Sequence, residues 1–481
     1  MDEKVKRGST GLAVKVGLWY VLSNFLVKAI SFITTPLFAR LMTPEQYGEF
    51  SNYASWQSTL LILTGAEMYS TLSRAYYDYT EDYDQYVSSV TVTGFFITGG
   101  MYILFLLNQS WIYSVVAIPP QFVHMLFFTL AFQSCKAIWL ARERTLYRYK
   151  TVAVVSMLNL VVPTLVALAL VLWLPEEQRL SGRLYGTYIP MSAIGIGCAV
   201  QMLHKGRAFR LDHAKYAFKL SLPLLVHFMT VSLLTSSNTV ITKSIMGAEA
   251  AALVSITTST IHILTILFQT LSGAVTTWLM DNLNQKNVGT VRKGIGIYSA
   301  GVVIVAIGTI LLAPEIVWIL GGKQYMAAVD LIPGMVLGIV FQSVASIFNI
   351  ILTYDKNVVK TAVYTGIVAV ISILAKILLL PVFGYNSLAW INALAFGALF
   401  VINYFLVKKS GYGGYLDLKV ISAVICGCGV FVAISGGLYQ HALLRYGVIA
   451  LAVVASFAVL YRFRHPIMKL LKSKLKKKNN G

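Results

Sequence analysis

The sequence predicts an all-α polytopic membrane protein with about fourteen transmembrane helices. Hydrophobic residues make up 57% of the 481 residues and charged residues only 12%, and the mean hydropathy is +0.71. An ordinary soluble domain is about a quarter charged. Apolar stretches of membrane length follow one another from Val16 to Tyr461. Because a helix of about 20 residues crosses a bilayer core and satisfies its own backbone hydrogen bonds, each stretch is predicted to be a helix.

Each predicted helix is long enough to cross a bilayer, and the connections between them are short. An even number of crossings places both ends of the chain on the same side of the membrane. The predicted spans are residues 15–39, 47–73, 86–108, 118–141, 150–174, 185–204, 216–243, 250–280, 291–313, 327–353, 358–380, 386–407, 417–438 and 443–462.

Positive charge is sorted between the two sides of these spans. Most of the 39 lysines and arginines fall in alternate connections and near the two chain ends. The positive-inside rule therefore predicts a multi-pass membrane protein with both termini in the cytoplasm. Attraction to anionic inner-leaflet lipid accounts for the net charge of +20 without a nucleic-acid partner. The cations assigned to the outer side are Arg40, Arg179, Arg183, Lys243, Lys323 and Arg445.

The connections offer little room for enzyme chemistry. The longest outer ones, residues 174–186 and 313–326, contain no histidine and few acidic residues. The sequence has no HExxH motif, no phosphate-binding glycine loop and no cluster of metal ligands, so neither a metal nor a cofactor is expected. A transporter is favoured over an enzyme, and a membrane glycan polymerase or transferase is the less favoured alternative. The four cysteines lie inside spans and are interpreted as packing thiols: Cys135, Cys198, Cys426 and Cys428.

A short internal repeat indicates how the helices are organised. Residues 39–48 align with residues 242–251, and each segment has a cation at a helix end, a turn with Pro or Gly, and a nearby acid. Transporters are commonly built from such repeats. We therefore predict an N-terminal lobe with helices one to six and a C-terminal lobe with helices seven to twelve, followed by two additional helices and a basic tail. The boundaries are 1–210, 211–410, 411–463 and 464–481.

Three segments resemble polysaccharide-transport flippases of the multidrug, oligosaccharidyl-lipid and polysaccharide exporter superfamily. They are Ile33 to Phe50 (ITTPLFARLMTPEQYGEF), Arg74 to Tyr77 and Leu140 to Arg144. The resemblance implies two six-helix lobes around a central cavity and alternating access. It also implies that the substrate is an undecaprenyl-pyrophosphate-linked oligosaccharide, carried from the inner to the outer leaflet of a bacterial or archaeal plasma membrane for polysaccharide biosynthesis. Membrane lipids and other polysaccharide-assembly proteins are the remaining partners to consider.

Polar residues repeat at spacings of three and four along four predicted helices, which places each row on one helix face. We interpret the rows as the lining of a hydrated cavity. Hydrogen bonding between helices by Ser, Thr and Asn side chains is the alternative, and it is favoured for single hydroxyls. The rows are Asn24, Lys28, Ser31 and Thr35; Gln57, Thr64, Glu67, Thr71 and Arg74; Ser255, Ser259, His262, Thr265, Gln269, Ser272 and Thr276; and Gln342, Ser346, Asn349 and Thr353.

Cations within or beside the spans supply candidate ligands for a pyrophosphate. Lys28 lies near the centre of its helix, where an isolated charge is costly, so a role in the cavity is predicted, with a buried structural pair as the alternative. Lys376 is expected to snorkel toward the outer membrane boundary. Four further cations are predicted to ring the inner mouth, with positive-inside anchoring as the alternative for the last two: Arg74, Lys136, Arg142 and Arg144.

Other polar residues complete the predicted site. His227 and His262 are candidates for hydrogen bonding to sugar, with pairing to a neighbouring side chain as the alternative. Glu67 and, second, Asp330 are candidates for energy coupling, which leaves H⁺ and Na⁺ open as the coupling ion. Two transporter alternatives remain, a multidrug or cation antiporter of the same superfamily and a nonspecific scramblase. The scarcity of membrane-embedded carboxylates argues against the antiporter.

Overall fold

The computed structural model describes residues 34–65, 67–207, 209–355 and 358–451, and this part of the chain is helical without a strand. The first half contains α3 (Pro44–Gly65), η1 (Met68–Thr71), α4 (Leu72–Asp78), α5 (Tyr83–Leu107), α6 (Gln109–Val116), α7 (Pro120–Thr145), α8 (Tyr149–Trp173), η2 (Glu176–Gln178), α9 (Arg179–Gly206) and α10 (Leu211–Met246). The second half contains α11 (Ala248–Asn284), α12 (Val288–Leu311), α13 (Ala313–Gly321), η3 (Lys323–Leu331), α14 (Ile332–Tyr354), α15 (Val358–Phe383), α16 (Ser387–Val407), the short turns η4 (Lys408–Tyr412) and η5 (Gly413–Tyr415), and α17 (Leu418–Gln440).

Ten helices in the described residues are long and apolar enough to cross a membrane, or eleven if the bent α10 is one span. The prediction of an all-helical, multi-pass membrane protein is confirmed, whereas the count of fourteen stays a prediction. The first and last predicted spans lie largely outside the described residues. The span predicted over 47–73 is not continuous, because α3 ends at Gly65. The span predicted over 216–243 is bent by 41° near residue 231.

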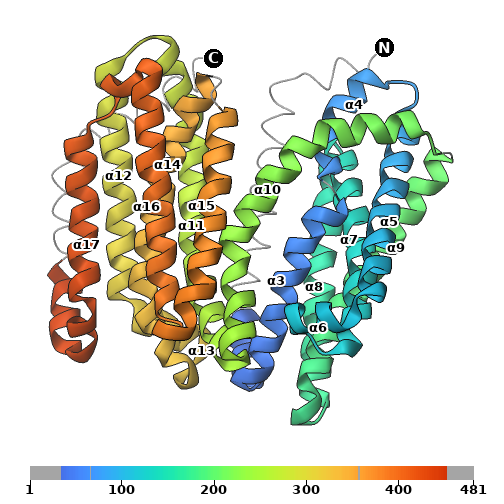
Figure 1. The fold of residues 1–481 in the computed structure, drawn as a ribbon, viewed down its shortest axis with the longest axis horizontal. Coiled ribbons are helices and arrows are strands. Elements are labelled where there is room, and N and C mark those ends of the chain that lie inside the picture. Colours follow the sequence, from blue (N-terminus) through green and yellow to red (C-terminus); the bar gives the residue numbers. More distant parts are fainter. Residues whose placement is uncertain (1–33, 66, 208, 356–357, 452–481) are drawn as a thin grey trace, which may run out of the picture.

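Two groups of helices stand side by side in Figure 1. We call α3 to α9 the N-terminal bundle and α11 to α17 the C-terminal bundle. Helix α10 runs between them and packs on α3 and α5 of the first and on α11 and α15 of the second. Large apolar side chains such as Leu165, Ile371 and Phe405 remain exposed on the outside of the bundles. An apolar outer face is expected of helices that have lipid as their surroundings.

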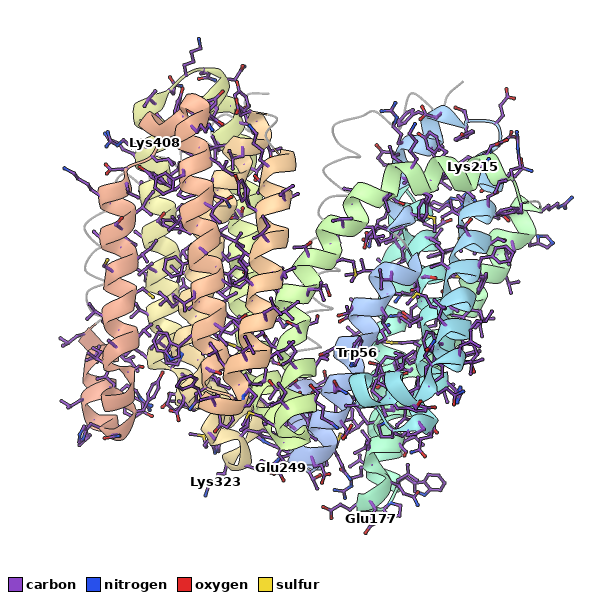
Figure 2. All side chains as sticks on the ribbon, viewed as in Figure 1. Trp56, Glu177, Lys215, Glu249, Lys323 and Lys408 are labelled. Carbon is purple, nitrogen blue, oxygen red and sulfur yellow. The ribbon has the colours of Figure 1, made fainter. Side chains whose placement is uncertain are left out.

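The two ends of the molecule carry the residues that the sequence assigned to opposite sides of the membrane. Lys215 and Lys408 lie at one end, which we call the basic end (Figure 2). Glu177, Glu249 and Lys323 lie at the other, which we call the opposite end. The ribbons of the two bundles diverge toward the basic end and come together at the opposite end (Figure 1).

Contacts at the opposite end hold the two bundles together. The backbones approach so closely that a Cβ atom on Gly48 of α3 would lie 1.8 Å from the carbonyl oxygen of Ala248 of α11. Beside this contact, the Glu49 carboxylate of α3 lies 2.6 Å from the Lys243 ammonium in the last turn of α10, directly before α11. A glycine at position 48 is therefore a steric requirement of this contact.

Candidate functional site

A cavity of about 470 Å³ lies in the C-terminal bundle beside α10. This volume is within the range of about 300–1,000 Å³ of small-molecule sites. Hydroxyls, amides and one imidazole supply the polar part of its lining, and no Asp, Glu, Lys or Arg is among the described residues that line it. The lining residues are Thr35, Leu234, Thr235, Asn238, Thr258, Ser259, Ile261, His262, Ile263, Thr265, Ile266, Met335, Ile339, Gln342, Asn392 and Phe396.

Four helices bring these polar groups together. Ser259, His262 and Thr265 follow one another at helical spacing on α11, and Gln342 faces them from α14. Asn392 of α16 donates a hydrogen bond from Nδ2 to Oδ1 of Asn238 on α10, over 3.2 Å. Ser259 and Thr265 donate their hydroxyl hydrogens to backbone carbonyls one turn earlier. Their oxygens therefore retain acceptor capacity for hydroxyl donors in the cavity.

A smaller cavity of about 210 Å³ continues along the same two helices. It shares Thr265, Ile339 and Gln342 with the larger cavity and adds Ser272 and Ser346, whose hydroxyl oxygens lie 3.4 Å apart. The polar rows predicted on α11 and α14 thus face cavities over several turns. That these rows contact the substrate stays a prediction.

Other predicted ligands lie elsewhere or outside the described part. Asn349 accepts a hydrogen bond from Asn403 of α16 over 3.0 Å, which is the interhelical pairing weighed as the alternative. Asn24 and Lys28 lie outside the described residues. The backbone at His227 and Gln269 is helical, but their side chains also lie outside the described part.

Arg74 and Arg144 are exposed cations of the N-terminal bundle. The Arg74 side chain is 73% exposed and lies 3.2 Å from the Asp78 carboxylate. Tyr216 of α10 donates a hydrogen bond to the same carboxylate. This bond and the Arg74 guanidinium hold the pKa of Asp78 below its usual value. The exposed guanidinium is therefore ordered but remains open to an anion in solvent.

Arg142 and Lys136 differ from those two cations in burial. Arg142 is 3% exposed, its Nε lies 2.9 Å from the Asp84 carboxylate of α5, and it also pairs with the buried Glu143. The guanidinium is thus occupied by carboxylates within the bundle and positions α5 against α7. Lys136 is half-buried and donates to the side-chain oxygen of Gln133. Neither arrangement resembles an exposed ring of cations around a mouth.

Glu67 lies at the break in the predicted helix 47–73. Its φ of 52° is left-handed, which costs a non-glycine residue of the order of 1–3 kcal/mol. The side chain is 4% exposed, and its Oε2 has no hydrogen-bond partner among the described residues. Asp330, the second coupling candidate, is exposed in η3 and lines neither of these cavities. Of the two candidates, Glu67 has the more unusual surroundings.

The snorkelling prediction for Lys376 is wrong. Lys376 belongs to α15, and its side chain is fully buried. Its Nζ donates to the carbonyl oxygen of Leu234 over 3.2 Å and to Oγ of Ser237 over 3.0 Å. Both acceptors belong to α10, and Leu234 also lines the larger cavity. Sequence reasoning did not select Asn238 or Asn392 either. For Asn392, an amide inside an otherwise apolar stretch of helix was the available signal.

Solved structures with a similar fold are membrane transporters. The fold is similar to that of the lipid II flippase MurJ in an inward closed conformation, with a TM-score of 0.70, 15% identity and coverage of 92% of this chain and 99% of that chain. It is also similar to an inward-facing multidrug resistance MATE family transporter of the MOP superfamily, with a TM-score of 0.58, 13% identity and coverage of 84% and 94%. At these identities the likeness shows the fold.

A search of the curated proteins finds no match. The family model described as polysaccharide biosynthesis protein matches residues 13–314, which is more than half of the chain. The resemblance predicted from the first third of the sequence is confirmed by this match. The chain therefore belongs to the polysaccharide biosynthesis protein family.

Proposed function

We propose that this protein flips an undecaprenyl-pyrophosphate-linked oligosaccharide from the inner to the outer leaflet of the plasma membrane by alternating access. The basic end faces the cytoplasm, as the positive-inside rule predicts. The closed contact at the opposite end then corresponds to an inward-facing state. Family membership and the uncharged polar cavity support the proposal, and the cavity is the observation that carries it.

The cavity lining matches the chemistry of a sugar chain. Neutral sugars present many hydroxyls and no charge, so they pair well with amides and hydroxyls such as those of Asn392, Gln342 and Ser259. Apolar side chains such as Ile339 and Phe396 lie beside these groups. A cation exporter would need an acidic or aromatic-rich pocket to offset the positive charge of its substrate. The described lining contains no carboxylate, which favours the glycan over the cation.

The pyrophosphate of the substrate is an anion, and the described lining of the cavity has no lysine or arginine to bind it. Arg74 and Arg144 are exposed cations that can draw a pyrophosphate from the cytoplasmic leaflet. Lys28, outside the described residues, is proposed as the cation that receives it inside. The polyprenyl tail remains in lipid, where it loses none of its apolar surroundings.

Glu67 is the proposed coupling residue. A buried carboxylate in a broken membrane helix is stabilised either by a proton or by a bound cation, and either changes its charge. When the two bundles move relative to each other, the groups that surround the Glu67 carboxylate change. A proton or sodium gradient can therefore bias one state through this residue.

The test measures transport of a fluorescent lipid-linked oligosaccharide in proteoliposomes. The double variant Ser259→Ala/Gln342→Met removes two polar groups from the cavity, and a rate about tenfold lower is expected. Thr309→Val, at a half-buried position of α12 that lines neither cavity, is the matched control and should keep the wild-type rate. Glu67→Gln should lose acceleration by an imposed proton or sodium gradient.

Three results would contradict the proposal. A double variant with the wild-type rate would remove the cavity from the pathway. Equal flux in both directions without a gradient would identify a scramblase. Transport of a cationic dye in place of the glycolipid would identify an antiporter.

A further inference from the structure

A third cavity, of about 660 Å³, lies at the basic end of the C-terminal bundle. It lies away from the polar cavity described above and shares no lining residue with it. Lys409 and Ser410 directly follow Lys408, which marks this end of the molecule in Figure 2. The lining residues are Asp355, Lys360, Tyr364, Ile402, Phe405, Leu406, Lys409 and Ser410.

The spacing of these residues places the cavity in the seam between α15 and α16. Lys360 and Tyr364 are one turn apart near the start of α15. Ile402, Phe405 and Lys409 follow one another at intervals of three and four residues at the end of α16 and the turn after it. On both sides the lysine is nearest the basic end and the apolar residues lie deeper along the helix. The cavity therefore presents cations at the membrane boundary and apolar surface below them.

The apolar surface continues beyond the cavity along the outside of both helices. On α15, Ile367 and Ile371 follow Tyr364 at helical spacing and are exposed. On α16, Val401 and Phe405 are exposed as well. A ligand in this seam would thus have its polar part between the lysines and any hydrocarbon part against the lipid-facing sides of the helices. A soluble anion would contact only the part of this surface beside the two lysines.

The charge of the lining limits the class of ligand. Lys360 and Lys409 oppose the single carboxylate of Asp355, so the described lining carries a net positive charge. The hydroxyls of Tyr364 and Ser410 add hydrogen-bonding capacity. Basic pockets between membrane helices at the cytoplasmic surface suit anionic lipid headgroups. We propose that this cavity binds an anionic phospholipid, with its phosphate between Lys360 and Lys409 and its acyl chains along α15 and α16.

The test uses the full-length protein in detergent and measures retained lipid by native mass spectrometry. Wild-type protein should retain phosphatidylglycerol in preference to phosphatidylcholine. Lys360→Gln/Lys409→Gln should lower phosphatidylglycerol affinity at least about tenfold, because two charges that attract the headgroup are removed. Lys408→Gln is the matched control: Lys408 is an exposed neighbour outside the cavity lining, so binding should be unchanged.

Further arms separate the phospholipid from other sources of phosphate. Lys360→Arg/Lys409→Arg should keep most of the binding, which shows that charge rather than altered folding explains the loss in the glutamine variant. Wild-type affinity in the glutamine variant would overturn the proposal. Displacement of the phospholipid by inorganic phosphate would indicate a simple anion site and would also overturn it. Tighter, lysine-dependent binding of a polyprenyl pyrophosphate than of phosphatidylglycerol would assign the cavity to the transported substrate instead.

Discussion

Glu49 of α3 and Lys243, in the last turn of α10, form an ion pair of 2.6 Å where α10 leads into the C-terminal bundle, with only 18% and 14% of their side chains exposed. Lys243 and Arg40 occupy equivalent positions in the two repeats aligned from the sequence. Arg40 also reaches across the boundary, donating to the carbonyl oxygens of Trp318 and Ile319 over 3.2 and 3.3 Å. Equivalent cations of the two repeats therefore both hold the opposite end closed.

Reversing one charge of this pair is expected to open the opposite end. In Glu49→Lys or Lys243→Glu, two like charges face each other in a largely buried contact, which disfavours closure by about 1–3 kcal/mol. Distance measurements between spin labels on the two bundles should show a larger outward-open population. The exchanged double variant, Glu49→Lys/Lys243→Glu, should restore closure. Labels that report the same distance distribution in all four proteins would show that the pair does not stabilise closure.

Gly48 provides a steric test of the same contact. In Gly48→Ala, the new Cβ would meet the backbone oxygen of Ala248 at 1.8 Å, and a backbone atom cannot rotate away. The closed contact must separate, and a flipping rate at least about tenfold lower is expected if closure costs more than about 1.4 kcal/mol. Gly301→Ala on α12 is the matched control, because its Cβ would meet no atom within 4 Å. Similar rates in the two variants would contradict the proposed role of the close approach.

Helical spacing predicted the parts of the site that depend on a single helix. Ser259, His262 and Thr265 share one face of α11 because of their spacing, and Gln342 could be placed on a polar face of α14 in the same way. The break before Glu67 could not be found this way, because a lone glycine such as Gly65 is tolerated inside helices. The spacing of residues along the sequence therefore predicted which face of a helix is polar, but it did not predict where a helix is interrupted.

Residues whose role depends on a second helix were harder to predict. Arg142 and Arg144 are two positions apart, yet Arg142 is buried and Arg144 is exposed. The difference comes from Asp84, which lies on another helix and has no signal in the local sequence. Lys376 was misjudged for the same reason, since its acceptors lie on α10. Neighbouring helices, rather than position along a span, decide whether such a cation is buried.

Arg142 should affect stability rather than substrate affinity. Arg142→Gln removes the guanidinium that pairs with Asp84 and with the buried Glu143, and it leaves Glu143 only the 3.4 Å contact with the half-exposed Arg148. Breaking a buried ion pair costs up to about 3–5 kcal/mol. The unfolding temperature in detergent should fall clearly. Arg144→Gln changes an exposed cation two residues away and should leave that temperature nearly unchanged. Equal stability of the two variants would mean that the buried ion pairs contribute little to the fold.

His213, near the start of α10, should make the attachment of this helix to the N-terminal bundle sensitive to pH. The ring is buried, with its centroid 4.6 Å from that of Tyr79 and 5.6 Å from that of Tyr86. Burial, and then the positive charge of Arg210, lower the pKa of His213 from its ordinary value of 6.5, although Asp82 and Asp212 act in the opposite direction.

Because the folded pKa of His213 is lowered, the unfolded chain binds more protons as the solution is acidified. The stabilising contribution is thus complete above about pH 6.5 and is lost as the pH falls through that value toward the folded pKa. Thermal unfolding measured between about pH 7.5 and pH 5 should show a decreasing midpoint in the wild type. His213→Phe keeps an aromatic ring against Tyr79 and Tyr86 but cannot be protonated, so its midpoint should fall less steeply. If the two proteins show the same slope, other groups cause the loss, since the phenylalanine variant removes only this titration.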